Sequence, residues 1–198
     1  TATFTPTASV TNASNLITLD NTGVTDAAGN SGSGTTDSNN YAINNGRPTA
    51  PIVVADNALL DRDTPLVTIT FSEAVSGFTN ADLSIANGTL TAVGTTDCGI
   101  TWTATLTPTA NTSNATNLIT LDKSGVTDWA GNAGSGTTSS NIYAIDNARP
   151  TATISVGDIA LSTGETSLVT VTFSEIVTNF SNADVTIANG SLSDVVSV

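Results

Sequence analysis

The sequence has no histidine, no methionine and one cysteine among its 198 residues, and only four lysines and arginines. Without histidine, and with no base for Cys98, the common acid–base and nucleophilic catalysts are missing. One cysteine cannot close an internal disulfide, so Cys98 is either a thiol without a role or a bridge to another molecule. We therefore predict that the protein is not an enzyme.

The shortage of bases also limits the partners. Four bases stand against 17 acids, and the net charge is −13. Nucleic acid and anionic membrane surfaces are bound through clustered lysine and arginine, so neither is expected as a partner. There is no apolar run long enough to span a membrane, so no direct membrane insertion is expected. We expect the chain to be cut from something longer, so its targeting signals are not visible.

Apolar residues at helical spacing are equally scarce, while threonine, serine, asparagine and glycine are abundant. Threonine, valine and isoleucine favour strands, and asparagine, aspartate and glycine favour turns. The composition therefore predicts an all-β protein with almost no helix.

The chain repeats itself at a spacing of 102 residues. The segment 1–36 matches 103–138, and 61 of the 96 aligned positions over the whole chain are identical. This period is too long for a solenoid unit and suits a whole small domain. We expect a segment of a tandem array that begins in the middle of a repeat and belongs to a longer protein.

The segments YAINNGRP (41–48) and YAIDNARP (143–150) have the character of domain junctions, because a short strand is followed by polar residues and a stiffening proline. They predict the C-terminal half of a repeat at 1–46, a complete repeat at 47–148 and the N-terminal half of a repeat at 149–198. Together the halves lack only the counterpart of 97–102. The tail of one molecule could therefore pair with the head of the next in a continuous fibre, unless the chain simply stops at arbitrary points.

Short strands punctuated by turns fill the complete repeat. About seven such strands in a domain of this size predict an immunoglobulin-like β-sandwich, without the cysteine pair of antibody domains. The core candidates are Phe71, Phe78, Trp102 and Leu106. The predicted strands are 51–55, 66–71, 82–86, 89–93, 101–107, 117–121 and 141–145.

Acidic and amide side chains recur in register near strand ends and are candidate calcium ligands, because calcium binds six to eight oxygens from carboxylates, amides and backbone carbonyls. No closed calcium motif such as an EF-hand loop is present. Turn formation, a strand-entry cap in the case of Asp82, and plain solubility are the alternatives. The candidates are Asp26 with Asn30, Asp128 with Asn132, Asp56, Asp158, Glu73, Glu175, Asp82, Asp184, and Asp146, which Asn44 replaces one repeat earlier.

The segments RPTA, VTITFSEAVSGFTNADLSIANGTL, TWTATLTPTA and GVTDWAGNAGSGT resemble the bacterial immunoglobulin-like repeats of giant biofilm-associated and RTX-type surface adhesins. The resemblance covers the whole chain. It implies an extracellular protein, at a bacterial cell surface or in a secreted matrix, whose neighbouring repeats form a rod. It also implies calcium held near the linkers, by Asp26, Asp128 and Asp146 and less securely by Asp56 and Asp158.

The leading prediction is thus a calcium-rigidified structural rod that extends a binding region or assembles head to tail. The alternative is a module that binds a surface or a glycan itself. Trp129, which stands where the first repeat has Ala27, is the aromatic candidate for a glycan. The alternating threonines of 1–7 and 101–107 would suit ice binding, although ordinary strand alternation explains them as well.

Overall fold

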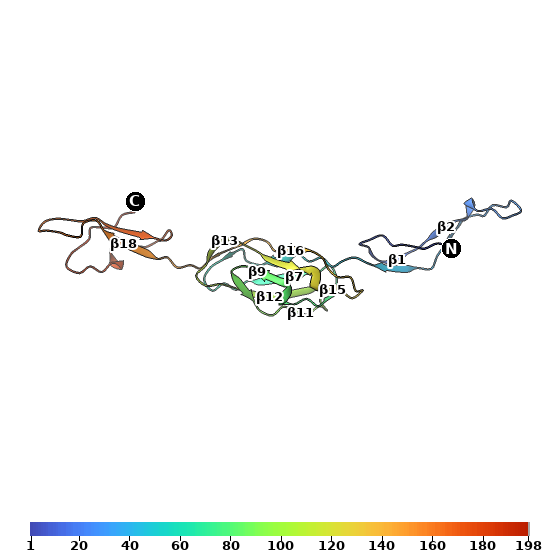
Figure 1. Ribbon diagram of the computed structural model, residues 1–198, viewed down its shortest axis with the longest axis horizontal. Helices are drawn as coiled ribbons and strands as arrows, with labels where there is room; N and C mark the ends of the chain where they lie inside the picture. Colours follow the sequence, from blue (N-terminus) through green and yellow to red (C-terminus); the bar gives the residue numbers. More distant parts are fainter. Residues whose placement is uncertain (198) are drawn as a thin grey trace. The chain divides into compact units, whose positions relative to one another are not determined.

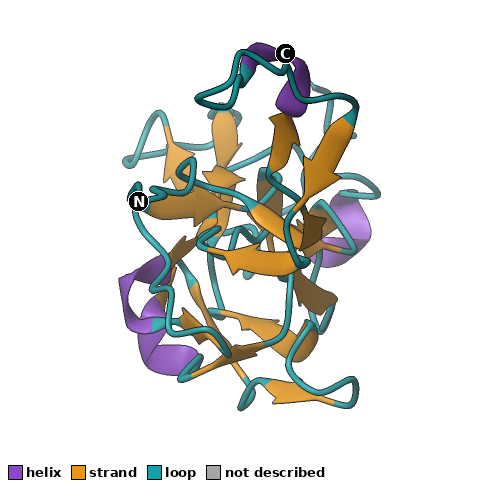
Figure 2. Cartoon of the chain, turned by 90° about the vertical axis from the view of Figure 1, so that its right-hand side faces the viewer, coloured by secondary structure: helices purple, strands orange, loops and turns teal. Residues whose placement is uncertain are grey.

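The computed structural model describes residues 1–197 and forms two compact units, Thr1–Asn147 and Ala148–Val198. We call residues 1–46 the head half-repeat, residues 47–147 the complete repeat and residues 148–197 the tail half-repeat. The described residues are all-β, as predicted, with short 3-10 turns in place of α-helices (Figure 2). No helix among them is long and apolar enough to cross a membrane.

The complete repeat is an immunoglobulin-like β-sandwich, which confirms the predicted fold class. Its first half contributes seven short strands and its second half contributes six. The strands of the first half are β5 (Ile52–Val54), β6 (Ala58–Leu59), β7 (Leu66–Thr70), β8 (Val75–Ser76), β9 (Leu83–Ile85), β10 (Gly88–Leu90) and β11 (Gly94–Thr95). Those of the second half are β12 (Thr101–Pro108), β13 (Ser113–Asn117), β14 (Ile119–Asp122), β15 (Thr127–Asp128), β16 (Thr137–Ser139) and β17 (Tyr143–Asp146). Figure 1 labels β7, β9, β12, β13 and β15 among them.

Most of the ladders join one half of the complete repeat to the other. Strand β12 pairs with β7, β10 and β11, β14 pairs with β9, and β15 pairs with β8, all antiparallel, while β17 pairs with β6 in parallel. Only β5–β7, β13–β17 and β14–β16 lie within a half. Neither half can therefore complete its sheets alone.

The core follows the period of two in the strands. In β7, Val67 and Ile69 are buried while Leu66 and Thr70 face solvent. The predicted core residues are confirmed: Phe71, Phe78 and Leu106 are buried, and Trp102 is partly buried against them. The Phe78 ring lies between Phe71 and Trp102, with centroids 5.3 and 5.2 Å away in edge-to-face geometry.

The predicted strand positions were right for β7 and β12 and wrong in four places, one of which is the strand predicted at 141–145, which begins only at Tyr143. The segment 82–86 begins as a strand only at Leu83, because Asp82 ends the 3-10 turn η2 (Asn80–Asp82). The segment 117–121 is two strands, since β13 ends at Asn117 and β14 begins at Ile119. The strand predicted at 89–93 ends at Leu90.

The half-repeats keep only the ladders that lie within a half. In the head, β1 (Thr11–Asn15) pairs with β4 (Tyr41–Asn44), and β2 (Thr18–Asp20) pairs with β3 (Thr35–Asp37). In the tail, β18 (Ala152–Val156) pairs with β19 (Val169–Phe173). The remaining elements are the 3-10 turns η1 (Asn21–Gly23), η3 (Lys123–Gly125) and η4 (Asn182–Asp184).

Candidate metal centre at the repeat junction

The segment Asp128–Asn132 forms a tight loop around the Asp128 carboxylate. Its Oδ1 accepts the backbone N–H groups of Ala130 (2.9 Å) and Asn132 (2.8 Å), and its Oδ2 accepts the Asn132 side-chain amide at 2.8 Å. Gly131 sits at φ 89°, a left-handed conformation that glycine adopts without strain. Asp128 is only 3% exposed, so the loop buries a carboxylate at the surface end of β15.

A second carboxylate reaches this loop from the other half of the repeat. Strand β8 pairs with β15, with Val75 opposite Asp128, and this brings Glu73 beside the Asp128 carboxyl and the Asn44 side chain. Partial burial, and then the Asp128 charge, raise the pKa of Glu73, while Asn44 lowers it. Two carboxylates thus face each other at the start of the complete repeat.

The pKa of Asp128 moves the other way. Burial raises the pKa, but the hydrogen bonds from Asn132 and Ala130, together with the contact to Glu73, outweigh burial and hold the pKa below its usual value. Asp128 is therefore ionised at neutral pH, and any proton shared by the pair resides on Glu73.

The same loop is tied to the linker that precedes the repeat. The Asn132 side chain donates to the Asn44 carbonyl at 3.1 Å, and the Arg47 guanidinium donates to the Ala133 carbonyl at 3.0 Å. Asn44 is the last residue of β4 in the head half-repeat. Asn44, Glu73, Asp128 and Asn132, which we call the junction cluster, therefore join the linker to both halves of the complete repeat.

The chemistry of the junction cluster suits a hard cation in part. It offers two carboxylates, two amide side chains and the Asn44 carbonyl, which are oxygen donors of the kind calcium prefers. However, over residues 1–197 no three Asp, Glu, His or Cys side chains gather closely enough to hold a metal, and the Asp128 oxygens already accept three N–H groups. Because the junction cluster has only two carboxylates, we expect it to bind a cation weakly.

The head half-repeat has the same loop without the second carboxylate. Asp26 accepts the Ala28 and Asn30 N–H groups at 2.9 Å each and the Asn30 amide at 2.8 Å. These hydrogen bonds lower the pKa of Asp26, and the one from the Asn30 side chain has the largest effect. Asp26 and Asn30 are exposed, and they border a hollow of about 490 Å³ together with Val24.

Four of the predicted ligands make local turn and capping bonds. Asp56 and Asp158 each accept the N–H two residues later, at Ala58 and Ala160, at 3.0 Å. Asp82 and Asp184 close capping boxes on the two 3-10 turns, where they accept the N–H of Thr79 (2.8 Å) and Ser181 (3.0 Å). In these positions the carboxylates satisfy backbone donors within their own segments.

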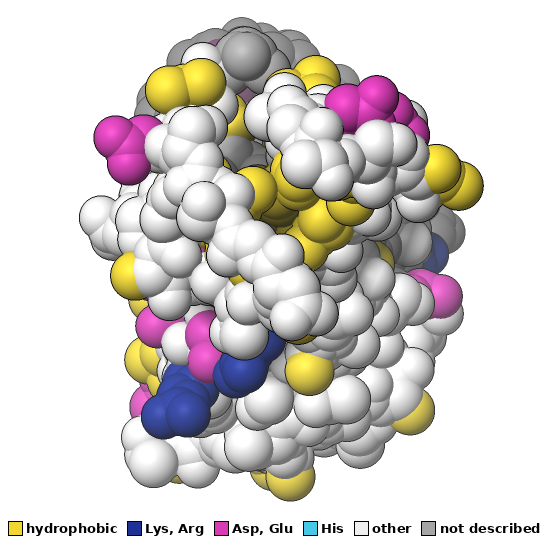
Figure 3. Space-filling view, turned by 90° about the vertical axis from the view of Figure 1, so that its left-hand side faces the viewer, with side chains coloured by type: hydrophobic (Ala, Val, Ile, Leu, Met, Phe, Trp, Pro, Cys, Tyr) yellow, Lys and Arg dark blue, Asp and Glu magenta, His cyan; other side chains and the backbone are white. Residues whose placement is uncertain are grey.

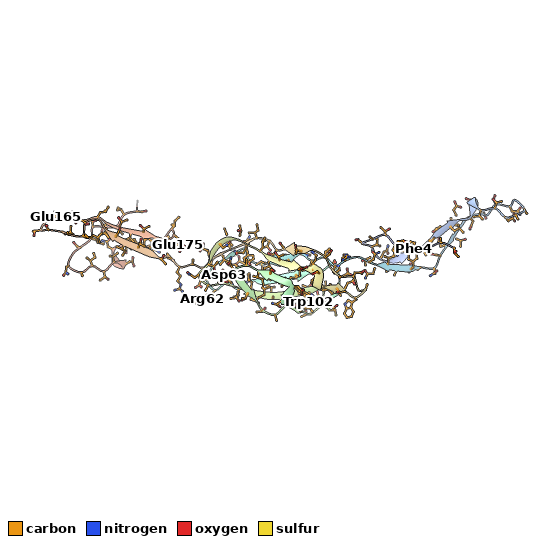
Figure 4. The ribbon with its side chains drawn as sticks, viewed as in Figure 1. Phe4, Arg62, Asp63, Trp102, Glu165 and Glu175 are labelled. Atoms are coloured by element: carbon orange, nitrogen blue, oxygen red, sulfur yellow. The ribbon has the colours of Figure 1, made fainter. Side chains whose placement is uncertain are left out.

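The remaining two candidates lie apart from the junction cluster. Asp146 is exposed at the end of β17, opposite Ser113 of β13, and Figure 1 places β13 and β15 at opposite ends of the complete repeat. Asp146 therefore takes the place of Asn44 one repeat later and does not share a site with Asp128. Glu175 is exposed in the tail, two residues after β19 ends, and Glu165 lies at the far end of the tail strands (Figure 4).

The sequence marked all four members of the junction cluster as recurring positions, but it did not predict that they lie close together. That depends on β8 and β15, which have two residues each and carry no readable alternation. The contact from Arg47 to Ala133 was not predicted, and the recurring RPTA segment was its only signal.

The comparisons with known proteins give one match. The family model described as bacterial Ig-like domain matches residues 1–43, 44–145 and 146–198. Neither a curated protein nor a solved structure matches the chain. Because the family model covers the whole chain in these three consecutive matches, the chain belongs to the bacterial Ig-like domain family.

Proposed function

We propose that this chain is a non-catalytic structural segment of an extracellular bacterial protein, an adhesin or a matrix fibre, whose repeats are joined into a rod stiffened by calcium at their junctions. The observation that carries the proposal is the junction cluster. It ties the linker to the complete repeat and sets the Glu73 and Asp128 carboxyls side by side.

Electrostatics supply the reason for a cation. No Lys or Arg is among the groups that act on the Glu73 carboxyl, and Arg47 donates to a backbone carbonyl instead. A divalent cation between the carboxylates would replace their repulsion with attraction and would add the Asn44 oxygens from the linker. The linker and the repeat would then move as one body, as a stiff rod requires.

Calcium titration by calorimetry tests this proposal. The expected result is one weak site per chain, lost in Glu73→Gln and retained in Asp61→Asn, an exposed acid whose neighbour in the structure is Arg62. Asn44→Asp should tighten binding several-fold, because it gives the first junction the aspartate that Asp146 provides at the second and so adds a third carboxylate.

Solution scattering tests the stiffening separately from binding. EDTA should shorten the parent chain and lower its melting temperature, and it should change neither in Glu73→Gln. If calcium produced no heat, and EDTA left both the radius of gyration and the melting temperature of the parent unchanged, the calcium proposal would be wrong.

A second candidate function, glycan binding, has one observation in its favour. Trp129 is 80% exposed at the tip of the Asp128–Asn132 loop, as a sugar-stacking aromatic would be. A glycan array on the parent and on Trp129→Ala tests it, and identical binding by both would remove Trp129 as a sugar platform.

A further inference from the structure

We propose that the parallel pair of β6 and β17, which we call the clamp, holds the complete repeat closed when the chain is pulled from both sides. The proposal goes beyond the calcium junctions described above, because the clamp lies inside the repeat and needs no cation. Only its use in a rod under tension rests on the proposed function.

The clamp follows from the direction of its two strands. Tension enters the complete repeat at Arg47 and leaves it at Asn147. Strand β6 belongs to the first part of the repeat and β17 is its last strand, and they form the one parallel ladder within residues 1–197. Tension therefore draws β6 toward its N-terminal end and β17 toward its C-terminal end, so the two strands would have to slide past each other. In this geometry the bonds between the strands share the tension and fail together, whereas strands peeled from one end lose their bonds one at a time.

The clamp is short, but it is shielded from water. Ala144 lies opposite Ala58 and Ile145 lies opposite Leu59, and the Ala144 N–H donates to the Asn57 carbonyl at 2.8 Å. Leu59 and Ile145 are each 1% exposed and belong to the hydrophobic core. Water therefore cannot replace the bonds of the clamp until the strands have moved, and a hydrogen bond in such surroundings is stronger than one in water.

One side chain extends the clamp to β5. Asn141 precedes β17, and its Oδ1 accepts the Val54 N–H at 2.8 Å while its Nδ2 donates to the Val54 carbonyl at 3.2 Å. The Asn141 amide thus pairs with β5 as the backbone of a neighbouring strand would, and Val54 is buried. The first two strands of the repeat are therefore both bonded to its last segment.

The point where the chain leaves β17 is fastened as well. The Asn147 N–H donates to the Thr112 carbonyl at 2.9 Å, its Oδ1 accepts the Thr112 N–H at 2.7 Å, and its Nδ2 donates to the Thr109 carbonyl at 3.0 Å. Asn45 makes the same three bonds one repeat earlier, after β4. Tension beyond Asn147 therefore acts on β17 and on the turn between β12 and β13 together, which keeps β17 from peeling away from its C-terminal end.

Neither a covalent crosslink nor an ion pair joins the first strands to the last within residues 1–197. Cys98 is a free cysteine, and the ion pair of this part of the chain joins the sequence neighbours Asp61 and Arg62. Charged side chains are few on the face shown in Figure 3. Resistance to extension therefore has to come from the ladders and the core.

The residues of β6 recur in a segment that otherwise changes between repeats. Between 55–63 and 157–165 three positions are identical, and in the complete repeat they are Asp56, Ala58 and Leu59. Asp56 accepts the Ala58 N–H at 3.0 Å at the start of β6. The chain thus retains β6 and its cap while the neighbouring residues differ, as expected if each repeat needs the clamp.

Force spectroscopy on the 198-residue chain, held by its two ends in EDTA, tests the proposal. Unfolding of the complete repeat should release about 30 nm of chain, which identifies the event. Leu59→Ala and Leu121→Ala are a matched pair of variants, because both leucines are fully buried and only Leu59 lies in the clamp. Urea unfolding gives the stability that each variant loses, and each change in rate under force is compared with that loss.

The two variants should differ in their unfolding rates at the same force. Weakening a contact that is already broken at the barrier speeds unfolding, whereas weakening one that is still intact there does not. Leu59→Ala should therefore unfold at least about tenfold faster than the parent, and Leu121→Ala should stay within about threefold of it. Rates that rise equally for equal losses in urea would overturn the proposal.

A change in the direction of pulling tests the clamp in a second way. In a Cys98→Ser background, Asn57→Cys and Ile142→Cys place two handles at exposed positions next to the N-terminal ends of β6 and β17. Tension between these handles peels the clamp from one end, so the repeat should unfold at a lower force than in end-to-end pulling at the same loading rate. An equal or higher force would contradict the clamp. Because both experiments are made in EDTA, their failure leaves the calcium proposal standing, and an absence of calcium binding leaves the clamp standing.

Discussion

The same six residues, NLITLD, occur in the head half-repeat and in the complete repeat, but their burial differs between the two. In the complete repeat Leu121 is fully buried between β16 and β9, while in the head Leu19 has only β3 beside it and is half exposed. The comparison shows that in this fold the burial of a strand is decided by the other half of the repeat. The three ladders that survive in the half-repeats are those formed within a half.

The largest expected difference between the two regions concerns this leucine. Leu121→Ala should destabilise the complete repeat by about 2–5 kcal/mol, because it leaves a cavity in a closed core. Leu19→Ala should change the stability of the dilute chain by no more than about 0.5 kcal/mol, because the side chain is already exposed. Urea unfolding followed by far-ultraviolet circular dichroism, which reports on the strands of both regions, measures both, and equal effects would contradict the comparison.

The paired loop aspartates should give the next largest difference. Asp128→Ala leaves the backbone N–H groups of Ala130 and Asn132 without an acceptor in a buried place, at a cost of about 1–3 kcal/mol. Asp26→Ala exposes the same groups to water and should cost much less. Thermal melts of the two variants in EDTA compare them without any contribution from a metal.

A smaller effect is expected from the capping carboxylate. Asp82→Ala removes the bond to the Thr79 N–H and should cost about 1 kcal/mol in the complete repeat, whether calcium is present or not. A cost that depended on calcium would show that Asp82 is a ligand as well as a cap. The measurement is a pair of melts, one in EDTA and one in excess calcium.

The smallest effect concerns pH. The folded-state pKa of Glu73 is raised, so its contribution favours the folded state below its unfolded pKa and is lost as the pH rises through the folded value. In EDTA at neutral pH, Glu73→Gln should therefore stabilise the complete repeat, by on the order of half a kcal/mol after solvent screening.

The depressed pKa of Asp128 gives the opposite dependence, since its contribution is present above the unfolded pKa and lost as the pH falls through the folded one. In excess calcium, Glu73→Gln should destabilise the complete repeat instead of stabilising it, because the variant lacks a calcium ligand. Melts of parent and variant across the acid range, with and without calcium, separate the two carboxyls. A stabilisation unaffected by calcium would contradict the role of Glu73 as a ligand.

Much of the fold could be predicted from the sequence, because apolar and polar residues alternate along the long strands. The long strands β7 and β12 have buried apolar residues at every second position, and the aromatic residues could be assigned to the core. Two-residue strands such as β6 and β8 were not predictable, since their pairing is fixed by register with segments about 50 to 90 residues away and not by local pattern.

The candidate site, like the fold, was predictable from the sequence only in part. The loop around Asp128 could be foreseen as a turn, because aspartate, asparagine and glycine at that spacing satisfy backbone donors locally. That Glu73 reaches it, and that Asp56 and Asp82 only satisfy nearby N–H groups, depends on tertiary placement. Recurrence in register marked all of these acids equally and could not separate ligands from caps.

Hydrogen exchange along the two copies of NLITLD is the most direct test of the central claim, that the other half of the repeat decides how far this strand is paired and buried. The amides of β14 should exchange slowly at every concentration, because both edges of the strand are paired. The amides on the open edge of β2 should exchange fast, because only the edge that pairs with β3 is protected. Exchange along β2 as slow as along β14 would contradict the claim.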